Sequence, residues 1–293
     1  MANIRQIRRR IRTVSNTAKI TNALQLVAAS KMKRAQERAT ASRPYADKLR
    51  EVLGDVAATI SEDQRNHPLL QEREGKKTAV IFITPDRGLC GGLPSNLNRA
   101  AAAFVLERRG EGAEVSSVAV GRKGRDFLRR NGVKIDAEFA DLGDFPSLLE
   151  VTPIIRIATE GFLSGEYDRV FLLYPMFVNT VTQRPTAVQL LPITSAEAKG
   201  EDRGEREVDY IFEPSPEHVL DEMLPRYVEL VVYQSVLDAR ASEQSARMVA
   251  MKNATDSAKD VVRTLTLLYN KARQEQITKE LLDIVGGVEG LAG

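Results

Sequence analysis

The sequence predicts a long antiparallel coiled coil, formed by the two ends of the chain, with an α/β domain inserted between them. Three observations lead to this fold class. The N-terminal segment repeats apolar and small residues at alternating steps of three and four, which is the heptad pattern of a coiled coil. The C-terminal segment shows the same pattern. The segment between them alternates strand and helix signals, which is typical of a mostly parallel sheet.

The first element is a helix that we place at residues 1–58. Its first glycine is Gly54, and only one proline, Pro44, precedes that glycine. Fifty helical residues would span roughly 75 Å. The heptad positions begin bulky and become small: Ile4, Ile7, Ile11, Val14, Ala18, Thr21, Gln25, Ala28, Met32, Ala35 and Ala39. We call these positions the N-terminal seam.

The last element is a second long helix, which we place at residues 214–286. Neither glycine nor proline occurs between Pro225 and Gly286, so about 60 residues can be helical without a break. A helix of this length needs a partner along it, and each seam is the obvious partner of the other. The C-terminal seam, again small in its middle, is Leu237, Ala241, Gln244, Met248, Met251, Thr255, Ala258, Val262, Leu265, Tyr269 and Ala272.

The middle of the chain reads as a Rossmann-like α/β domain, which we place at residues 76–194. Apolar runs predict strands at 77–84, 115–121, 167–178 and 185–193, and two segments that end at glycine predict helices at 96–110 and 121–132. The flanking segments 61–75 and 195–207 are polar and are predicted to be connections.

Composition excludes several classes of protein. No run of 18 apolar residues exists, so no membrane span is expected, and the basic N-terminus lacks the apolar core of a secretory signal. Because Cys90 is the single cysteine, an internal disulfide and a multi-cysteine metal site are excluded. His67 and His218 are isolated, and no metal site is expected from them.

Charge is distributed unevenly along the chain. The first 50 residues hold 13 Lys and Arg against 2 Asp and Glu, although the whole chain has a net charge of +2. Such asymmetry indicates a polyanionic ligand or an acidic protein partner. Nucleic acid is the less favoured partner, because Tyr45 is the only aromatic residue before residue 80 and stacking platforms are therefore absent. A solvated face of the coiled coil explains the charge most simply.

One loop, ITPDRGLCGGLPSNL at residues 83–97, has the position of a phosphate-binding loop between a strand and a helix. It matches neither G-x-x-x-x-G-K-[ST] nor G-x-G-x-x-G, so glycines that form tight turns are the favoured interpretation. Cys90 has no histidine near it in the sequence that could activate it. We therefore expect no active site and no cofactor in this chain.

Several motifs resemble the gamma subunit of the rotary F-type ATP synthase, in its bacterial form. The matching segments occur in the same order and cover essentially the whole chain: NTAKIT, LVAASKMKRAQ, SRPYA, DRGLCGGL, FVNTVTQRPTAVQLLPI, ASEQSARMVAMKNATD and YNKARQEQITKELLDIVGG. The resemblance implies the central rotor stalk, which couples proton-driven rotation of the membrane ring to conformational cycling of the catalytic beta subunits. It also explains why small residues occupy the middle of the C-terminal seam and the later part of the N-terminal seam, because a shaft that turns inside a ring must be thin.

The same resemblance implies the surroundings and the contact residues. The partners would be the alpha and beta subunits of the catalytic hexamer, the epsilon subunit and the membrane c-ring, at the cytoplasmic face of the bacterial cell membrane. The chain itself would be non-catalytic, with the apolar C-terminal end held in an apolar sleeve. The residues that the resemblance places against beta are Lys19, Leu24, Glu243, Arg247, Arg273, Gln274, Thr278 and Glu280.

The residues alone leave two other classes open. A basic coiled-coil adaptor for nucleic acid or membrane would show salt-dependent DNA binding. A nucleotide-binding enzyme built on the α/β domain would show saturable ATP binding.

Overall fold

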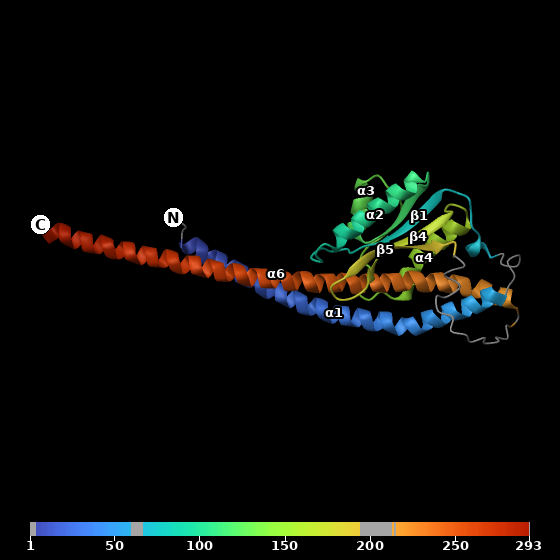
Figure 1. Cartoon of the computed structure of the whole chain (residues 1–293), viewed down its shortest axis with the longest axis horizontal. Coiled ribbons are helices and arrows are strands. Elements are labelled where there is room, and N and C mark those ends of the chain that lie inside the picture. Colours follow the sequence, from blue (N-terminus) through green and yellow to red (C-terminus); the bar gives the residue numbers. More distant parts are fainter. Residues whose placement is uncertain (1–3, 60–66, 194–212, 214, 293) are drawn as a thin grey trace. The chain divides into compact units, whose positions relative to one another are not determined.

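The computed structural model describes residues 4–59, 67–193, 213 and 215–292. It consists of two compact units: a terminal unit, residues 1–28 with 248–293, and a central unit, residues 29–247. Figure 1 shows the elements of both. Of the predicted polar connections, residues 61–66 and all of 195–207 lie outside the described residues.

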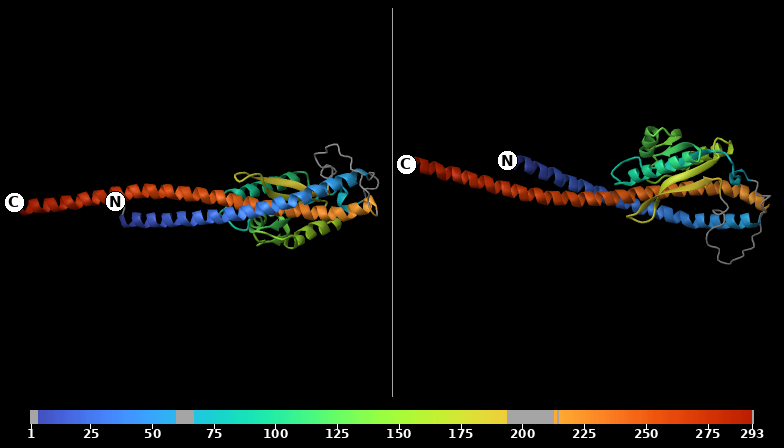
Figure 2. Two further views of the ribbon diagram at one scale, coloured as in Figure 1. Left: turned by 90° about the horizontal axis from the view of Figure 1, so that it is seen from below. Right: turned by 45° about the horizontal axis from the view of Figure 1, so that its top comes forward.

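Two long helices, α1 (Ile4–Thr59) and α6 (Pro216–Ala292), contribute to both units. In the terminal unit the hydroxyl groups of Thr21 and Thr255 are in contact, and Ile7 lines the same groove as Leu268. Residue numbers on α6 therefore fall as those on α1 rise, so the helices are antiparallel. Figures 1 and 2 show them side by side.

The central unit has the same arrangement of the two helices. Lys31 of α1 and Gln244 of α6 both bind Asp144, whereas Leu49 and Met223 line one groove further along. The predicted antiparallel pairing of the two chain ends is therefore confirmed in each unit.

The seams are confirmed position by position. Each of the 11 N-terminal and 11 C-terminal seam residues is buried or half-buried, and none is exposed. Helix α6 has 77 residues, begins close to the predicted start at residue 214, and continues through Gly286, where the predicted helix ended. A glycine inside a helix costs only about 1 kcal/mol, which the remaining helix can offset.

A five-stranded sheet occupies the centre of the central unit. Its order is β3-β2-β1-β4-β5, with β1 to β4 parallel and β5 antiparallel to β4. The strands are β1 (Lys77–Ile83), β2 (Glu114–Val120), β3 (Lys134–Phe139), β4 (Arg169–Phe177) and β5 (Gln183–Leu191). The four predicted strands are found close to their predicted positions, and β3 is an additional edge strand.

Each face of the sheet has its own hydrophobic core. Val80 and Phe82 of β1 belong to the core beneath α2 (Leu93–Gly110) and α3 (Arg122–Arg130). Ile81 and its alternate neighbours belong to the opposite core, which contains α4 (Leu148–Leu163), the short helix η2 (Pro68–Leu70), and parts of α1 and α6. The alternation of side chains along a strand explains this division.

Within the described residues, no helix combines the length and the hydrophobicity that crossing a membrane requires.

Candidate partner-contact surfaces

The seam of the terminal unit is lined by small side chains and one hydroxyl pair. Ala28 and Ala258 are buried, and Thr21 Oγ1 lies 2.7 Å from Thr255 Oγ1. Thr255 also donates to the carbonyl of Met251, 2.8 Å away. Small residues let two helices approach closely, and the paired hydroxyl groups leave no unsatisfied polar atom between them.

The two predicted contact residues on α1 lie on the surface of the terminal unit. Lys19 is exposed and Leu24 is half-buried. Ile20 and Val27 are exposed apolar residues, and their spacing from Leu24 of four and three residues places all three along one side of the helix. This strip of α1 can bind an apolar partner surface.

The four predicted contact residues near the end of α6 are all exposed: Arg273, Gln274, Thr278 and Glu280. Glu280 accepts a hydrogen bond of 2.8 Å from Gln276 on the same helix. Large apolar side chains share this part of the helix and are also exposed, namely Leu267, Leu268, Ile277, Leu281, Leu282, Ile284 and Val285. Such a set of exposed apolar residues is typical of a surface that a partner covers.

A groove of about 900 Å³ lies between the start of α1 and this part of α6. Its apolar floor includes Ile7 and Leu265, and its charged residues are mostly cations. The charged residues lining it are Arg5, Arg10, Lys271, Lys279 and Glu275. This excess of positive charge suits an acidic partner.

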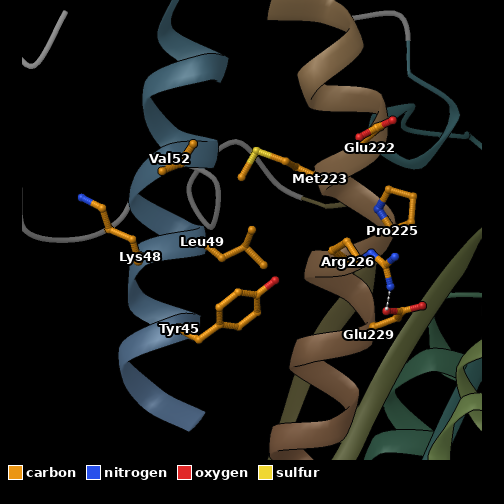
Figure 3. Close-up of a pocket in the computed structure, with 9 residues that line it drawn as sticks. All are labelled: Tyr45, Lys48, Leu49, Val52, Glu222, Met223, Pro225, Arg226 and Glu229. Carbon is orange, nitrogen blue, oxygen red and sulfur yellow. Dashed lines mark hydrogen bonds and ion pairs between the residues drawn. The ribbon is translucent and has the colours of Figure 1, made fainter. Parts of the chain in front are cut away.

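A second groove, of about 790 Å³, lies between α1 and α6 in the central unit. Figure 3 shows Leu49 and Val52 of α1 on one side of it and Met223 of α6 reaching toward them from the other side. Arg226 and Glu229 form an ion pair of 3.1 Å at its margin. The described residues that line it include neither a histidine nor a cysteine.

The remaining predicted contact residues, Glu243 and Arg247, belong to a buried ion network in the central unit. Arg247 Nη2 lies 2.7 Å from Glu243 Oε1, and Arg240 Nη1 lies 2.9 Å from the other oxygen of this carboxylate. The side chains of Glu243 and Arg247 are only 8% and 15% exposed. The carboxylate of Glu243 thus pairs with two guanidinium groups that have lost most of their contact with water.

The network extends to the loops of the α/β domain. Arg240 Nη2 lies 3.7 Å from Asp86 and donates to the carbonyl of Leu142 at 2.7 Å. Arg247 donates to the carbonyl of Gly88 at 3.4 Å. A second branch runs from Arg247 through Gln244 to Asp144, which also pairs with Lys31 of α1 at 2.7 Å.

Sequence reasoning did not identify Arg240, Asp86 or Asp144. The sequence did contain one indication of the role of Arg240. Arg240, Glu243 and Arg247 are spaced i, i+3 and i+7 and therefore share a face of the helix. Opposite charges at this spacing among small and apolar residues favour a buried network over a solvated surface. The loop partners could not be inferred, since they depend on how the sheet folds.

The glycine-rich loop after β1 is anchored rather than open. Cys90 is buried, and burial raises the pKa of its thiol although Arg247 acts in the opposite direction. Leu89 and Gly91 have positive φ angles of 64° and 61°, so the glycine serves the turn, as expected. A thiol of raised pKa is a poor nucleophile.

No group of three or more His, Cys, Asp or Glu side chains suited to a metal ion occurs among the residues that the structure describes. What the fold presents instead are two paired helices with a narrow seam, an inserted α/β domain and partner-sized surfaces on the outside of the helices. These features define a coiled-coil protein with an inserted α/β domain.

Comparison with known proteins gives the family. A sequence model described as ATP synthase matches residues 3–291. The chain is 53% identical to an ATP synthase gamma chain of Dehalococcoides mccartyi, over 100% of both chains. It also resembles a chain in the structure of the central stalk and c-ring of the Tetrahymena thermophila mitochondrial ATP synthase, with 27% identity, a TM-score of 0.59, and coverage of 80% of this chain and 99% of that one.

The fold is shared more widely. A chain in the rotor structure of the Euglena gracilis mitochondrial ATP synthase has a TM-score of 0.64 at 20% identity, covering 94% of this chain and 98% of that one. The chain belongs to the family of ATP synthase gamma chains. The resemblance drawn from its motifs and the predicted fold class are thereby confirmed, and so is the prediction of a gamma-type central-stalk subunit.

Proposed function

We propose that this chain is the rotating central stalk that couples proton-driven rotation of a membrane ring to conformational cycling of catalytic beta subunits, while carrying no active site itself. The observation that carries the proposal is the gamma-chain relationship over the full length of the chain, including both shaft helices. A shaft acts by presenting different faces to different subunits, and each contact then biases the conformation of the subunit it touches.

The partners follow from this role. We propose the alpha and beta subunits of the hexamer, the epsilon subunit and the c-ring as partners, with the chain held peripherally at the cytoplasmic face of the bacterial cell membrane. Residues 1–58 and 214–286 would form the shaft, and residues 76–194 the α/β domain. Nucleic acid is not among the proposed partners, because a thin seam and exposed apolar strips suit protein surfaces.

We assign the contacts with beta to the exposed sites at both shaft helices. Lys19 and Leu24 contribute through the apolar strip of α1. Arg273, Gln274, Thr278 and Glu280 contribute through the exposed end of α6. Glu243 and Arg247 have a smaller accessible area, so any contact they make with beta adds to their role inside the chain.

Reconstitution tests the proposed function. The purified chain, mixed with alpha and beta subunits, is expected to form a complex in which it lies between them, and the chain alone is expected to show no ATPase activity. A chain that does not assemble with the hexamer would refute the role as a central stalk.

Alanine replacement of Arg273 together with Gln274 tests the contact assignment. Because both side chains are exposed, the free chain should melt as the wild type does, whereas ATP synthesis by the complex should fall. Loss of one partly desolvated hydrogen bond to a charged group costs about 1.5–3 kcal/mol. Arg263→Ala is a control at an exposed site on the same helix, where Arg263 pairs with Asp260 at 3.4 Å. If the double variant synthesises ATP as well as the control does, the assignment is wrong.

A further inference from the structure

The carboxyl edge of the sheet is where open α/β folds bind their ligands. Such ligands lie outside the carboxyl ends of the strands, at the point where successive connections leave in opposite directions. In the order β3-β2-β1-β4-β5 this point lies between β1 and β4. Its walls are the loop after β1, residues 84–92, and the loop after β4, residues 178–182.

In this chain α6 fills that crevice. Residues 240–246 of α6 are all buried, and the loops after β1, β3 and β4 contact them. Arg240 meets the loop after β1 at Asp86 and the loop after β3 at Leu142. Ser245 Oγ donates to the carbonyl of Thr180, in the loop after β4, at 2.6 Å.

The hydrophobic contacts of α6 show that it passes across this edge. Ala239 belongs to the core on the α4 face of the sheet. Ala246, two turns further on, belongs to the core on the α2 face, together with Cys90. The residues between these two alanines therefore lie at the carboxyl edge itself.

The arrangement of hydrogen-bond donors and acceptors at this edge is the opposite of that in a phosphate-binding site. A phosphate-binding loop offers N–H donors to an anion. Here the edge offers mostly acceptors, and α6 supplies most of the donors; Gln183, which donates to Ser245 Oγ at 3.5 Å, is an exception. The acceptors contacted by α6 are the carbonyls of Gly88, Leu142, Pro175 and Thr180 and the carboxylates of Asp86 and Asp144. An acceptor-lined crevice suits guanidinium groups, whose several donors match it.

We propose that this crevice is a docking site for the chain's own helix, with Arg240 as the central cation, and that the docking locks the α/β domain to the shaft helix so that both turn as one body. The part about turning rests on the function proposed above. Arg240 is the residue best placed for this task, because among the described residues of α6 it is the one that reaches two loops and the carboxylate of Glu243.

Arg240→Met tests the lock, since it keeps an unbranched apolar stem and removes the donors. Glu243 keeps its partner Arg247 in this variant. In the full-length chain, amide hydrogen exchange in residues 84–92 and 140–147 should accelerate on the order of 100-fold, because breaking a buried pair is costly. The control, Arg226→Met, removes an ion pair at the same spacing on the same helix, with an exposed arginine and a half-buried glutamate, and should leave exchange in both loops unchanged.

Two further outcomes keep the lock and the proposed function apart. In the assembled complex, Arg240→Met should lower ATP synthesis more than ATP hydrolysis, relative to the control. Wild-type exchange in both loops would overturn the lock, whether or not the chain assembles with its partners. Accelerated exchange with an unchanged ratio of synthesis to hydrolysis would overturn its part in rotation. If Arg240→Met does not fold, Asp86→Asn replaces it, because it keeps the size of the side chain and an oxygen for the amide of Arg122.

Discussion

Ala35 offers a direct test of why the shaft is built from small residues. It is a seam residue of α1 in the central unit and is only 2% exposed. Its neighbour in the seam, Ala39, is 5% exposed, and Ala241 on α6 is 1% exposed. Ala35→Leu adds three carbon atoms at a position where a single methyl group is already enclosed.

The expected effect is a net loss of stability. If space were available, burying three more carbon atoms would contribute about 0.8 kcal/mol each. Because the site is enclosed, the larger side chain must displace a helix or leave its preferred rotamer, and overpacking of this kind costs about 1–3 kcal/mol overall. Each kcal/mol lowers the melting temperature of a domain of this size by roughly 2–4 °C.

Thermal unfolding of the full chain, followed by circular dichroism, measures this effect. Ala41→Leu is the matched control, because Ala41 lies on the same helix and is exposed, so that its replacement should leave the melting temperature nearly unchanged. Equal melting temperatures for the two variants would refute the argument that the seam is closely packed.

Three other predictions concern pH, the hydroxyl pair and ATP. Burial lowers the pKa of His67 below its ordinary value of 6.5, although Asp221 opposes this. The unfolded chain therefore binds the proton more readily, and the free energy of unfolding should fall as pH decreases from about 7 to 5. In denaturant titrations His67→Gln should flatten this pH dependence, and an unchanged slope would contradict the assignment. Thr255→Val should lower the free energy of unfolding by about 0.5–1.5 kcal/mol. The double variant Thr21→Val with Thr255→Val should lower it by less than the sum of the two single variants. Strict additivity would show that the two hydroxyl groups do not interact. Calorimetry of the full chain should detect no micromolar ATP binding, because α6 occupies the crevice; micromolar binding would show that this edge of the sheet is open to ligands.

The shaft was more predictable from the sequence than the sheet edge. Heptad spacing is a local property, and therefore every seam position could be assigned before the structure was known. Strand β3 was not predicted, because its residues Lys134 and Asp136 alternate with apolar ones at an exposed edge. Helix α4 was not predicted either, since it contains Pro153 and lacks a long polar face.

The candidate site was predictable only in part. Family motifs pointed to Glu243 and Arg247, but they predicted contacts with a partner subunit and did not predict the ion pair within the chain. The pairing with Asp86 depends on a loop far away in the sequence, which no local pattern connects to α6. Whether Arg273 and Gln274 contact beta stays a prediction.

The contact between Thr21 and Thr255 joins residues 234 positions apart, which has a consequence for synthesis of the chain. At ordinary translation rates of about 5–20 residues per second, α1 waits roughly 10–50 s for its partner to leave the ribosome. If its seam were rich in leucine, the first helix would expose an aggregation-prone hydrophobic surface during that interval. Because its seam consists largely of alanine and threonine beyond Val14, the seam of the waiting helix exposes little apolar surface to other nascent chains. The small residues that let the two helices of the finished shaft pack closely therefore also limit aggregation through the seam of the unfinished one.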